Sequence, residues 1–133
     1  MKYYLDTNTI IYFLKGTFPE LSEHFKKTPR QSIVIPSVVK AELEFGIHKS
    51  VRHAESADRI HRFINAFETA PFSDEAAVEY GKIRFALEKA GAPIGPNDLL
   101  IASIVKAEDG VLVTHNRKEF ERVEGLLLED WTI

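Results

Sequence analysis

Four acidic residues stand where they could act on one ligand. The first, Asp6, ends a short aromatic and aliphatic run, Tyr3–Leu5, and precedes a second apolar run that begins near Thr7. This pattern predicts a buried strand that ends at Asp6 and a helix that follows it. Open α/β sheets place their ligands at the carboxyl ends of such strands. Aspartate is also a good helix cap, so Asp6 alone does not decide between a cap and a site.

Glu42 lies on the apolar face of a helix predicted over residues 37–49. It is three or four positions from Val38, Val39 and Phe45, whereas the other polar residues of this segment recur on a different face. A carboxylate on an apolar face costs free energy unless it is paired, hydrogen-bonded or bound to a metal. A buried ion pair with a lysine or arginine is the structural alternative.

Asp98 falls in the first turn of a helix predicted to begin at Pro96. The helix dipole favours an acid there, which is the structural alternative. Helices of an α/β layer run antiparallel to the strands they connect. The helix leading to the strand Val111–Thr114 therefore begins at the same edge of the sheet as Asp6.

Asn116 and Glu119 follow that strand directly. Their spacing resembles a capping box, so a purely structural role is open. The same placement puts both residues at the edge where Asp6 and Asp98 are expected.

Carboxylates gathered at one edge repel one another and tend to stay protonated. Mg²⁺ or Mn²⁺ would remove that cost, because both are hard cations that prefer oxygen ligands. The histidines are scattered without zinc-like spacing, and only His115 is expected near this edge. The acidic residues therefore predict a magnesium or manganese site.

Short strands alternating with helices must position these acids. Strands are predicted up to Asp6, at residues 32–35, just before Pro71, and at residues 111–114 and 126–128. Helices are predicted from Thr7 and near residues 20–27, 37–49, 54–67, 73–90, 96–107 and 116–122. Ser37 is expected to cap one helix, and Gly91 and Gly110 to end two others. The alternation predicts an α/β fold with a parallel sheet covered by helices on both faces.

Length and composition fit one domain over residues 1–133. The formal net charge of −3 argues mildly against a broad basic face for phosphates, and grouped lysines and arginines are typical of a solvated helix face. The chain has no cysteine and no long apolar run, and we expect no signal peptide. We therefore expect a cytoplasmic protein that does not span a membrane.

Four motifs occur in an order that resembles the PIN-domain nucleases, and more narrowly the VapC-type toxins of toxin–antitoxin pairs. They are Leu5–Asn8, Val39–Leu43, Gly95–Ala102 and Thr114–Phe120, and the segment Glu129–Trp131 is also similar to that group. The resemblance covers nearly the whole chain. It implies a five-stranded parallel sheet in the order 3-2-1-4-5.

The resemblance also implies which residues form the site. The family's first three acids match Asp6, Glu42 and Asp98. Its fourth position, often Asp directly after strand 4, holds Asn116 here, and Glu119 one turn later is the charged residue expected to contribute instead. This departure leaves open whether one metal or two are held.

The implied activity is metal-dependent hydrolysis of RNA by an endoribonuclease, commonly on transfer RNA. Asp6 and Asp98 would be the primary ligands of Mg²⁺, for which Mn²⁺ can substitute, with Glu42 and Glu119 completing the catalytic set. The supporting residues Thr7, Asn8, Thr114 and Asn116 would orient ligands or the attacking water.

The resemblance also implies partners. VapC proteins usually form homodimers and are silenced by a small VapB-type antitoxin whose tail enters the active-site groove. The antitoxin, rather than the toxin, binds operator DNA. The RNA backbone would be held by nearby cations, and the sequence does not choose among Arg52, Arg84 and Arg117.

Other classes fit less well. A phosphatase of the haloacid dehalogenase type needs a second Asp two residues after the first, where this chain has Asn8. A receiver domain needs an acidic pair after its first strand, which is absent. A catalytically silent PIN-like binding module is the remaining alternative, and metal-dependent cleavage discriminates it from a nuclease.

Overall fold

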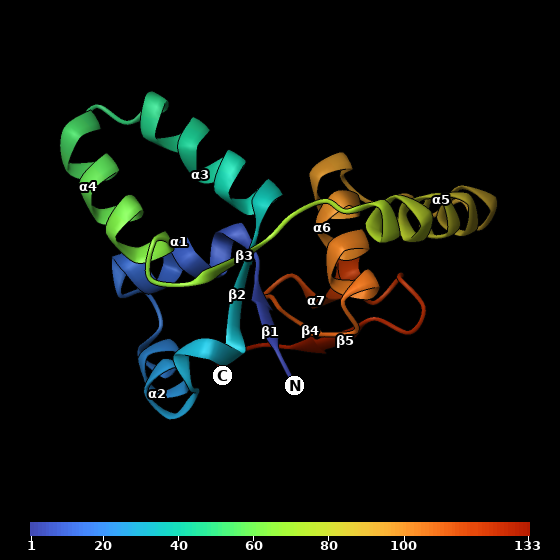
Figure 1. Cartoon of the computed structure of the whole chain (residues 1–133), viewed down its shortest axis with the longest axis horizontal. Coiled ribbons are helices and arrows are strands. Elements are labelled where there is room, and N and C mark those ends of the chain that lie inside the picture. Colours follow the sequence, from blue (N-terminus) through green and yellow to red (C-terminus); the bar gives the residue numbers. More distant parts are fainter.

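The fold is built on a parallel sheet of five strands, described here from a computed structural model of residues 1–133. The strands are β1 (Tyr3–Leu5), β2 (Ile33–Pro36), β3 (Glu68–Ala70), β4 (Val111–Val113) and β5 (Leu127–Glu129). Their order is β3-β2-β1-β4-β5, and every neighbouring pair is parallel (Figure 1). This confirms the predicted fold class and strand order.

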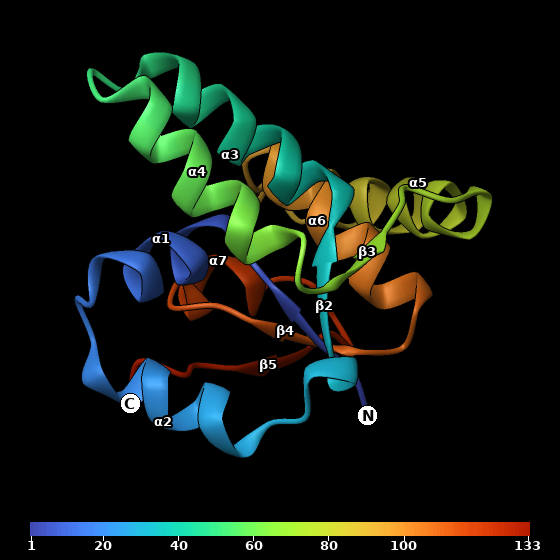
Figure 2. The same cartoon turned by 60° about the vertical axis from the view of Figure 1, so that its left-hand side comes forward.

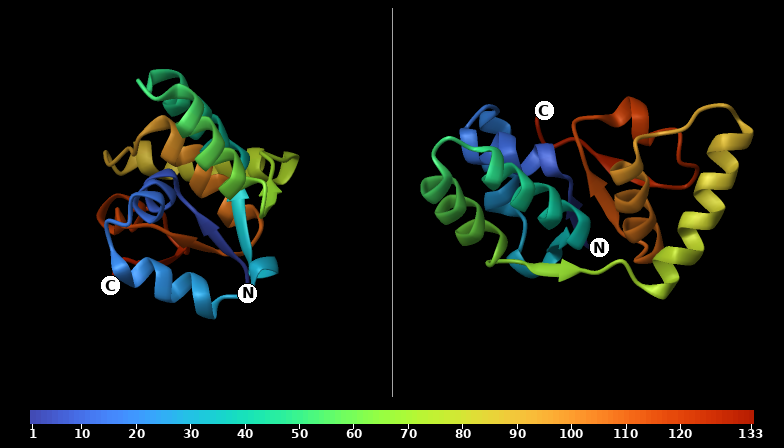
Figure 3. Two further views of the ribbon diagram at one scale, coloured as in Figure 1. Left: turned by 90° about the vertical axis from the view of Figure 1, so that its left-hand side faces the viewer. Right: turned by 90° about the horizontal axis from the view of Figure 1, so that it is seen from above.

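Seven α-helices connect and cover the strands. They are α1 (Thr7–Lys15), α2 (Pro19–Lys27), α3 (Ser37–Lys49), α4 (His53–Ile64), α5 (Asp74–Lys89), α6 (Pro96–Ala107) and α7 (Arg117–Phe120), and a 3-10 turn spans Arg30–Ser32. The sheet lies between α2 on one side and α6 on the other, and α5 packs on α6 (Figures 2 and 3). None of these helices combines the length and the apolar character needed to cross a membrane.

The register of β1 and β4 explains where the site forms. Leu5 pairs with Val113 in the parallel ladder, and both are fully buried. The next residue of each strand, Asp6 and Thr114, therefore leaves the sheet at the same level. Strand order reverses between these two strands, which is the point where open α/β sheets bind ligands.

The two arms of the molecule rise beyond that edge of the sheet. The helices α3 and α4 pair on one side, whereas α5 packs against α6 on the other (Figure 1). The chain enters α1 and α6 at this edge, so the first turns of both helices face it. The fold thus brings residues from α1, α3, α6 and α7 to one place.

Some predicted helix ends differ from the structure. Ser37 is the first residue of α3 and makes no capping hydrogen bond, because the extended residue before the helix is Pro36. After α6 the left-handed residue is Asp109, at φ 55°, and not Gly110. Gly110 is needed for another reason, since a side chain there would collide with the ring of Tyr4. Gly91, at φ 68°, follows α5 as predicted.

Candidate active site

Asp6 joins the sheet to α1. Its Oδ1 accepts a hydrogen bond from the Thr9 amide over 2.9 Å, so the predicted capping role is present. The residue is only 6% exposed. Burial raises the pKa of this carboxyl, hydrogen bonds from Thr114 and Thr9 oppose that rise, and the charge of Glu42 adds to it. Asp6 therefore caps a helix and belongs to an acidic cluster at the same time.

Glu42 is held by two neutral side chains from other helices. The Thr7 hydroxyl of α1 donates to its Oε1 over 2.5 Å, and the Asn97 amide of α6 donates to its Oε2 over 3.2 Å. The carboxylate is half-buried on α3, as its position on the apolar face predicted. Hydrogen bonds rather than an ion pair to lysine or arginine account for its placement.

Asp98 and Glu119 meet across the start of α6. Burial, and then the charge of Glu119 and a hydrogen bond with it, raise the pKa of Asp98 to about 7, with smaller contributions from Asp6 and Glu42. The Glu119 carboxyl has a lowered pKa, chiefly because the Gly95 amide donates to its Oε1 over 2.8 Å. Of the two carboxyls, Asp98 is therefore the one that binds a proton more readily.

Asn116 helps to orient Glu119. Its side-chain amide donates to Glu119 Oε2 over 2.7 Å, and its backbone amide donates to the Thr114 hydroxyl over 2.9 Å. A capping box would need Glu119 to accept from the backbone amide of Asn116, and Asn116 to cap α7 with its side chain. Neither bond is present, so the capping-box interpretation is wrong.

Gly95 borders both of these acids. A methyl group on its α-carbon would lie 3.6 Å from a carboxylate oxygen of Asp98 and 3.6 Å from one of Glu119. The two oxygens therefore face the same small space beside the backbone of residue 95. The four acids interact through their charges or through hydrogen bonds. We call them the carboxylate rim: Asp6, Glu42, Asp98 and Glu119.

The ligand atoms that the carboxylate rim offers suit a hard divalent cation. All are oxygens, and the raised pKa values of Asp6 and Asp98 express a burial and repulsion cost that a cation would relieve. No three Asp, Glu or His side chains lie close enough to enclose an ion in the present arrangement. Binding would therefore require some of these side chains to turn toward the ion.

Some of the other predicted residues contact the carboxylate rim and others do not. Thr7 and Thr114 contact rim residues, as expected for supporting groups. Asn8 is exposed and makes no side-chain hydrogen bond, so the structure does not bring it into the network. The three candidate arginines each pair with an acid three or four positions further along the chain: Arg52 with Glu55, Arg84 with Glu88, and Arg117 with Glu121.

Asn97 is a functional candidate that the sequence did not single out. It lies beside Asp98 in the predicted first turn, and that adjacency was the only available signal. Its contact with Glu42 joins residues 55 positions apart. The packing of α3 near α6 makes this contact, and no local pattern specifies it.

The fold is that of a known family of enzymes that act on nucleic acids. The model of the PIN domain family matches residues 3–126. Ribonuclease VapC2 of Rickettsia felis is 38% identical over 132 residues, covering 98% of each chain. The tRNA(fMet)-specific endonuclease VapC of Salmonella typhimurium is 34% identical over 131 residues, also covering 98% of each.

Solved structures agree with these relatives. The DNA-bound VapBC of Salmonella typhimurium contains a chain that superposes with a TM-score of 0.93 at 34% identity, covering 98% of both chains. VapBC2 of Rickettsia felis, bound to a DNA fragment from its promoter, gives a TM-score of 0.89 at 36% identity over 98% of this chain and 99% of that one. The present chain belongs to the PIN domain family and, within it, to the VapC ribonucleases.

Proposed function

We propose that this protein is the toxin of a toxin–antitoxin pair and acts as an Mg²⁺- or Mn²⁺-dependent endoribonuclease, with structured RNA such as transfer RNA as its substrate. The observation that carries the proposal is the carboxylate rim at the switch point of the sheet. Its acids come from four helices or helix starts, and two have raised pKa values for which a cation would compensate. The ribonuclease names of relatives at 34–38% identity support the choice of RNA.

Asp6 and Asp98 would hold the cation, with Glu42 and Glu119 completing the site directly or through water. When bound, Mg²⁺ or Mn²⁺ supplies a more acidic water and neutralises charge that develops on the phosphate. The reaction adds water to phosphorus and breaks one phosphorus–oxygen bond of the RNA backbone.

The neighbours of the rim keep these acids oriented. Thr7 and Asn97 fix the two oxygens of Glu42, and Asn116 and the Gly95 amide fix those of Glu119. Pre-oriented ligands lower the cost of organising a site, and loss of such partners commonly weakens metal binding or activity about 10- to 100-fold.

The same family membership supports partners. The related structures are VapBC complexes, and two of them contain promoter or other DNA. We therefore propose a VapB-type antitoxin as the inhibitor of this protein, with operator DNA bound through the antitoxin. A homodimer and a cytoplasmic location accompany this proposal as predictions.

Cleavage of a total transfer-RNA pool by purified, antitoxin-free protein tests the function. Wild type, Asp6→Asn and Asp98→Asn are compared in Mg²⁺, Mn²⁺ and EDTA. Asp74→Asn, an exposed acid in the first turn of α5, is the matched control. We expect discrete fragments with wild type and Asp74→Asn, and none with EDTA or with either rim variant.

A clear negative would point to the binding-module alternative. If antitoxin-free protein still binds Mn²⁺ but cuts neither transfer, ribosomal nor messenger RNA, the nuclease proposal is wrong. Catalytic silence would then make partner docking the leading interpretation of the rim.

A further inference from the structure

A hollow of about 190 Å³ lies beside the carboxylate rim, between α5 and the segment that leads into α6. We call it the α5–α6 hollow. Its lining includes Tyr80, Arg84 and Glu88 from α5, and Ile94, Pro96 and Leu99 from the other side. None of these residues belongs to the rim.

The hollow and the rim share one wall. Pro96 and Leu99 line the hollow, while Asp98, on the same helical turn, belongs to the rim. Gly95 lies between Ile94 and Pro96, and its amide donates to Glu119. A strand of RNA with a phosphate at the rim would therefore have its next nucleotide within reach of the hollow.

This shared wall is held in place from both ends. The Pro93 carbonyl accepts a hydrogen bond from Arg122 Nη1 over 2.9 Å, and the Gly95 amide is bound to Glu119 over 2.8 Å. The two prolines, Pro93 and Pro96, restrict the backbone on either side of Ile94. The wall is thus a preformed surface, which lowers the entropy cost of binding.

The chemistry of the hollow suits a planar, neutral, polar-edged group. Arg84 donates to the Tyr80 hydroxyl over 2.9 Å, and its guanidinium carbon lies 5.9 Å from the centre of the Tyr80 ring. Unpaired RNA bases are commonly held by stacking on aromatic rings and arginine planes. The aliphatic side chains of Ile94 and Leu99 add apolar contact surface.

Its charges favour a base over a phosphate. Arg84 Nε is paired with Glu88 Oε2 over 2.8 Å, so the guanidinium charge is already balanced. Arg84 Nη2 and Glu88 Oε1 make no hydrogen bond within the chain, so donor N–H groups and an acceptor oxygen remain available on two residues that line the hollow. The edges of bases present adjacent donors and acceptors of this kind, whereas a phosphate would be repelled by Glu88.

We propose that the α5–α6 hollow binds an unpaired base of the RNA, one nucleotide or so from the phosphate at the carboxylate rim. This inference rests on the proposed ribonuclease function and adds to it a site that selects looped RNA. Tyr80 supplies the stacking surface, and Arg84 with Glu88 reads the edge of the base.

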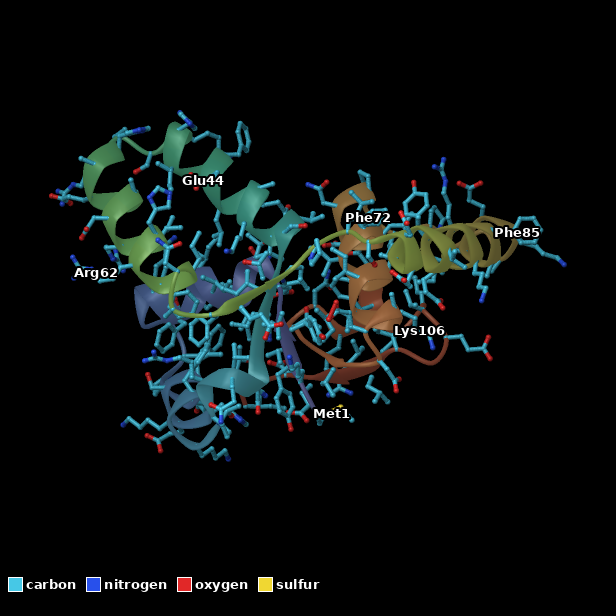
Figure 4. All side chains as sticks on the ribbon, in the orientation of Figure 1. Met1, Glu44, Arg62, Phe72, Phe85 and Lys106 are labelled. Atoms are coloured by element: carbon cyan, nitrogen blue, oxygen red, sulfur yellow. The ribbon has the colours of Figure 1, made fainter.

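Binding of a fluorescein-labelled RNA hairpin with a seven-nucleotide loop, followed by anisotropy in EDTA, tests the proposal without cleavage. Tyr80→Ala should weaken binding about 5- to 150-fold, the range that corresponds to loss of one stacked base. Tyr80→Phe keeps the ring and should bind nearly as wild type. Phe85→Ala, an exposed aromatic at the outer end of the same helix (Figure 4), is the matched control.

A second probe isolates the base itself. In the same hairpin with abasic loop nucleotides, wild type should bind more weakly, and Tyr80→Ala should cause no further loss. An equal loss with both hairpins would overturn the base-binding role. It would assign the effect to altered folding or to contact with the RNA backbone or another partner.

A charge-matched pair of variants covers the case in which Tyr80→Ala is unstable. Arg84→Gln and Arg62→Gln each remove one charge from an exposed i,i+4 ion pair, and Arg62 lies on the opposite arm (Figure 4). We expect Arg84→Gln to bind the intact hairpin at least threefold more weakly than Arg62→Gln. Equal binding by the two variants would contradict the proposal.

Cleavage of the transfer-RNA pool in Mn²⁺ separates this inference from the nuclease function. If wild type cleaves RNA but Tyr80→Ala and Phe85→Ala behave alike, the hollow is not a base site and the nuclease proposal stands. If wild type neither cleaves nor binds RNA, both proposals are wrong.

Discussion

The hydroxyl of Thr7 donates to Glu42 Oε1 over 2.5 Å and so joins the first turn of α1 to α3 across the carboxylate rim. The contact spans 35 positions of the chain. It fixes an acid from one arm of the molecule against the central sheet. Together with the Asn97 amide, this hydroxyl orients the carboxylate.

Thr7→Val removes that donor and keeps the shape of the side chain. We expect RNA cleavage to fall about 10- to 100-fold, as is common when a ligand loses its orienting partner. Thr7→Ser retains a hydroxyl and should recover most of the activity. Rates on the transfer-RNA pool measure the effect, and thermal unfolding verifies the fold. A Thr7→Val protein as active as wild type would remove Thr7 from the site.

The raised pKa of Asp98 should make the stability of the metal-free protein depend on pH. Its pKa is about 7 in the folded state and 3.8 in a model peptide, so between these values the folded protein binds the extra proton. Stability should therefore fall as pH rises from about 4 to 7 and then level off. In this range the folded state still binds a proton at Asp98, whereas the unfolded state has already released it.

Asp98→Asn cannot lose a proton, so it should remove this decline. Above pH 7 in EDTA we expect the variant to be more stable than wild type by about 1–2 kcal/mol. This is less than the free energy of the whole pKa shift, because solvent screens a half-buried group. Urea unfolding at pH 5 and pH 8 provides the comparison. A variant no more stable than wild type at pH 8 would show that the rim carries little electrostatic strain.

Cation binding should stabilise the folded protein. At an Mn²⁺ concentration about 100-fold above its dissociation constant, linkage gives about 2.7 kcal/mol, or on the order of 5–10 °C in Tm. Asp6→Asn and Asp98→Asn should lose most of this increase, whereas Asp74→Asn should keep it. Differential scanning fluorimetry with and without Mn²⁺ measures it independently of cleavage. An unchanged increase in both rim variants would place the cation elsewhere.

Gly95→Ala should separate stability from activity. The backbone of Gly95, at φ −58° and ψ 148°, accepts alanine without strain, and the new methyl would make ordinary contacts at 3.6 Å. We expect stability to change by less than about 1 kcal/mol. The methyl would nevertheless cover oxygens of Asp98 and Glu119, so Mn²⁺ affinity and cleavage should fall at least tenfold.

Gly81→Ala is the control for that substitution. Gly81 lies inside α5 with open space around it, so alanine there should stabilise the helix by about 0.5–1 kcal/mol without affecting cleavage. Mn²⁺ titration and unfolding curves of the two variants decide the matter. Equal Mn²⁺ affinity in Gly95→Ala and wild type would mean that the space beside residue 95 is not where the cation binds.

Residue patterns alone predicted the strands and helices and the edge of the sheet at which the acidic residues lie. Alternation of β-branched runs with amphipathic segments predicted five strands and the helices between them, because burial enforces that periodicity locally. The placement of Asp6, Asp98 and Glu119 after strands or at helix starts then followed from the parallel topology. Helix ends were predicted less well at Ser37 and Gly110, since a neighbouring residue can adopt the capping conformation.

The hydrogen bonds that hold the acidic side chains could not be predicted from local patterns. The bonds of Glu42 to Thr7 and Asn97, and of Glu119 to Gly95, join residues 35, 55 and 24 positions apart. Such pairings depend on how α1, α3, α6 and α7 pack, and local propensity carries no information about that packing. The raised pKa of Asp98 and the α5–α6 hollow were likewise not predictable from the sequence, because burial and proximity arise only when distant segments meet.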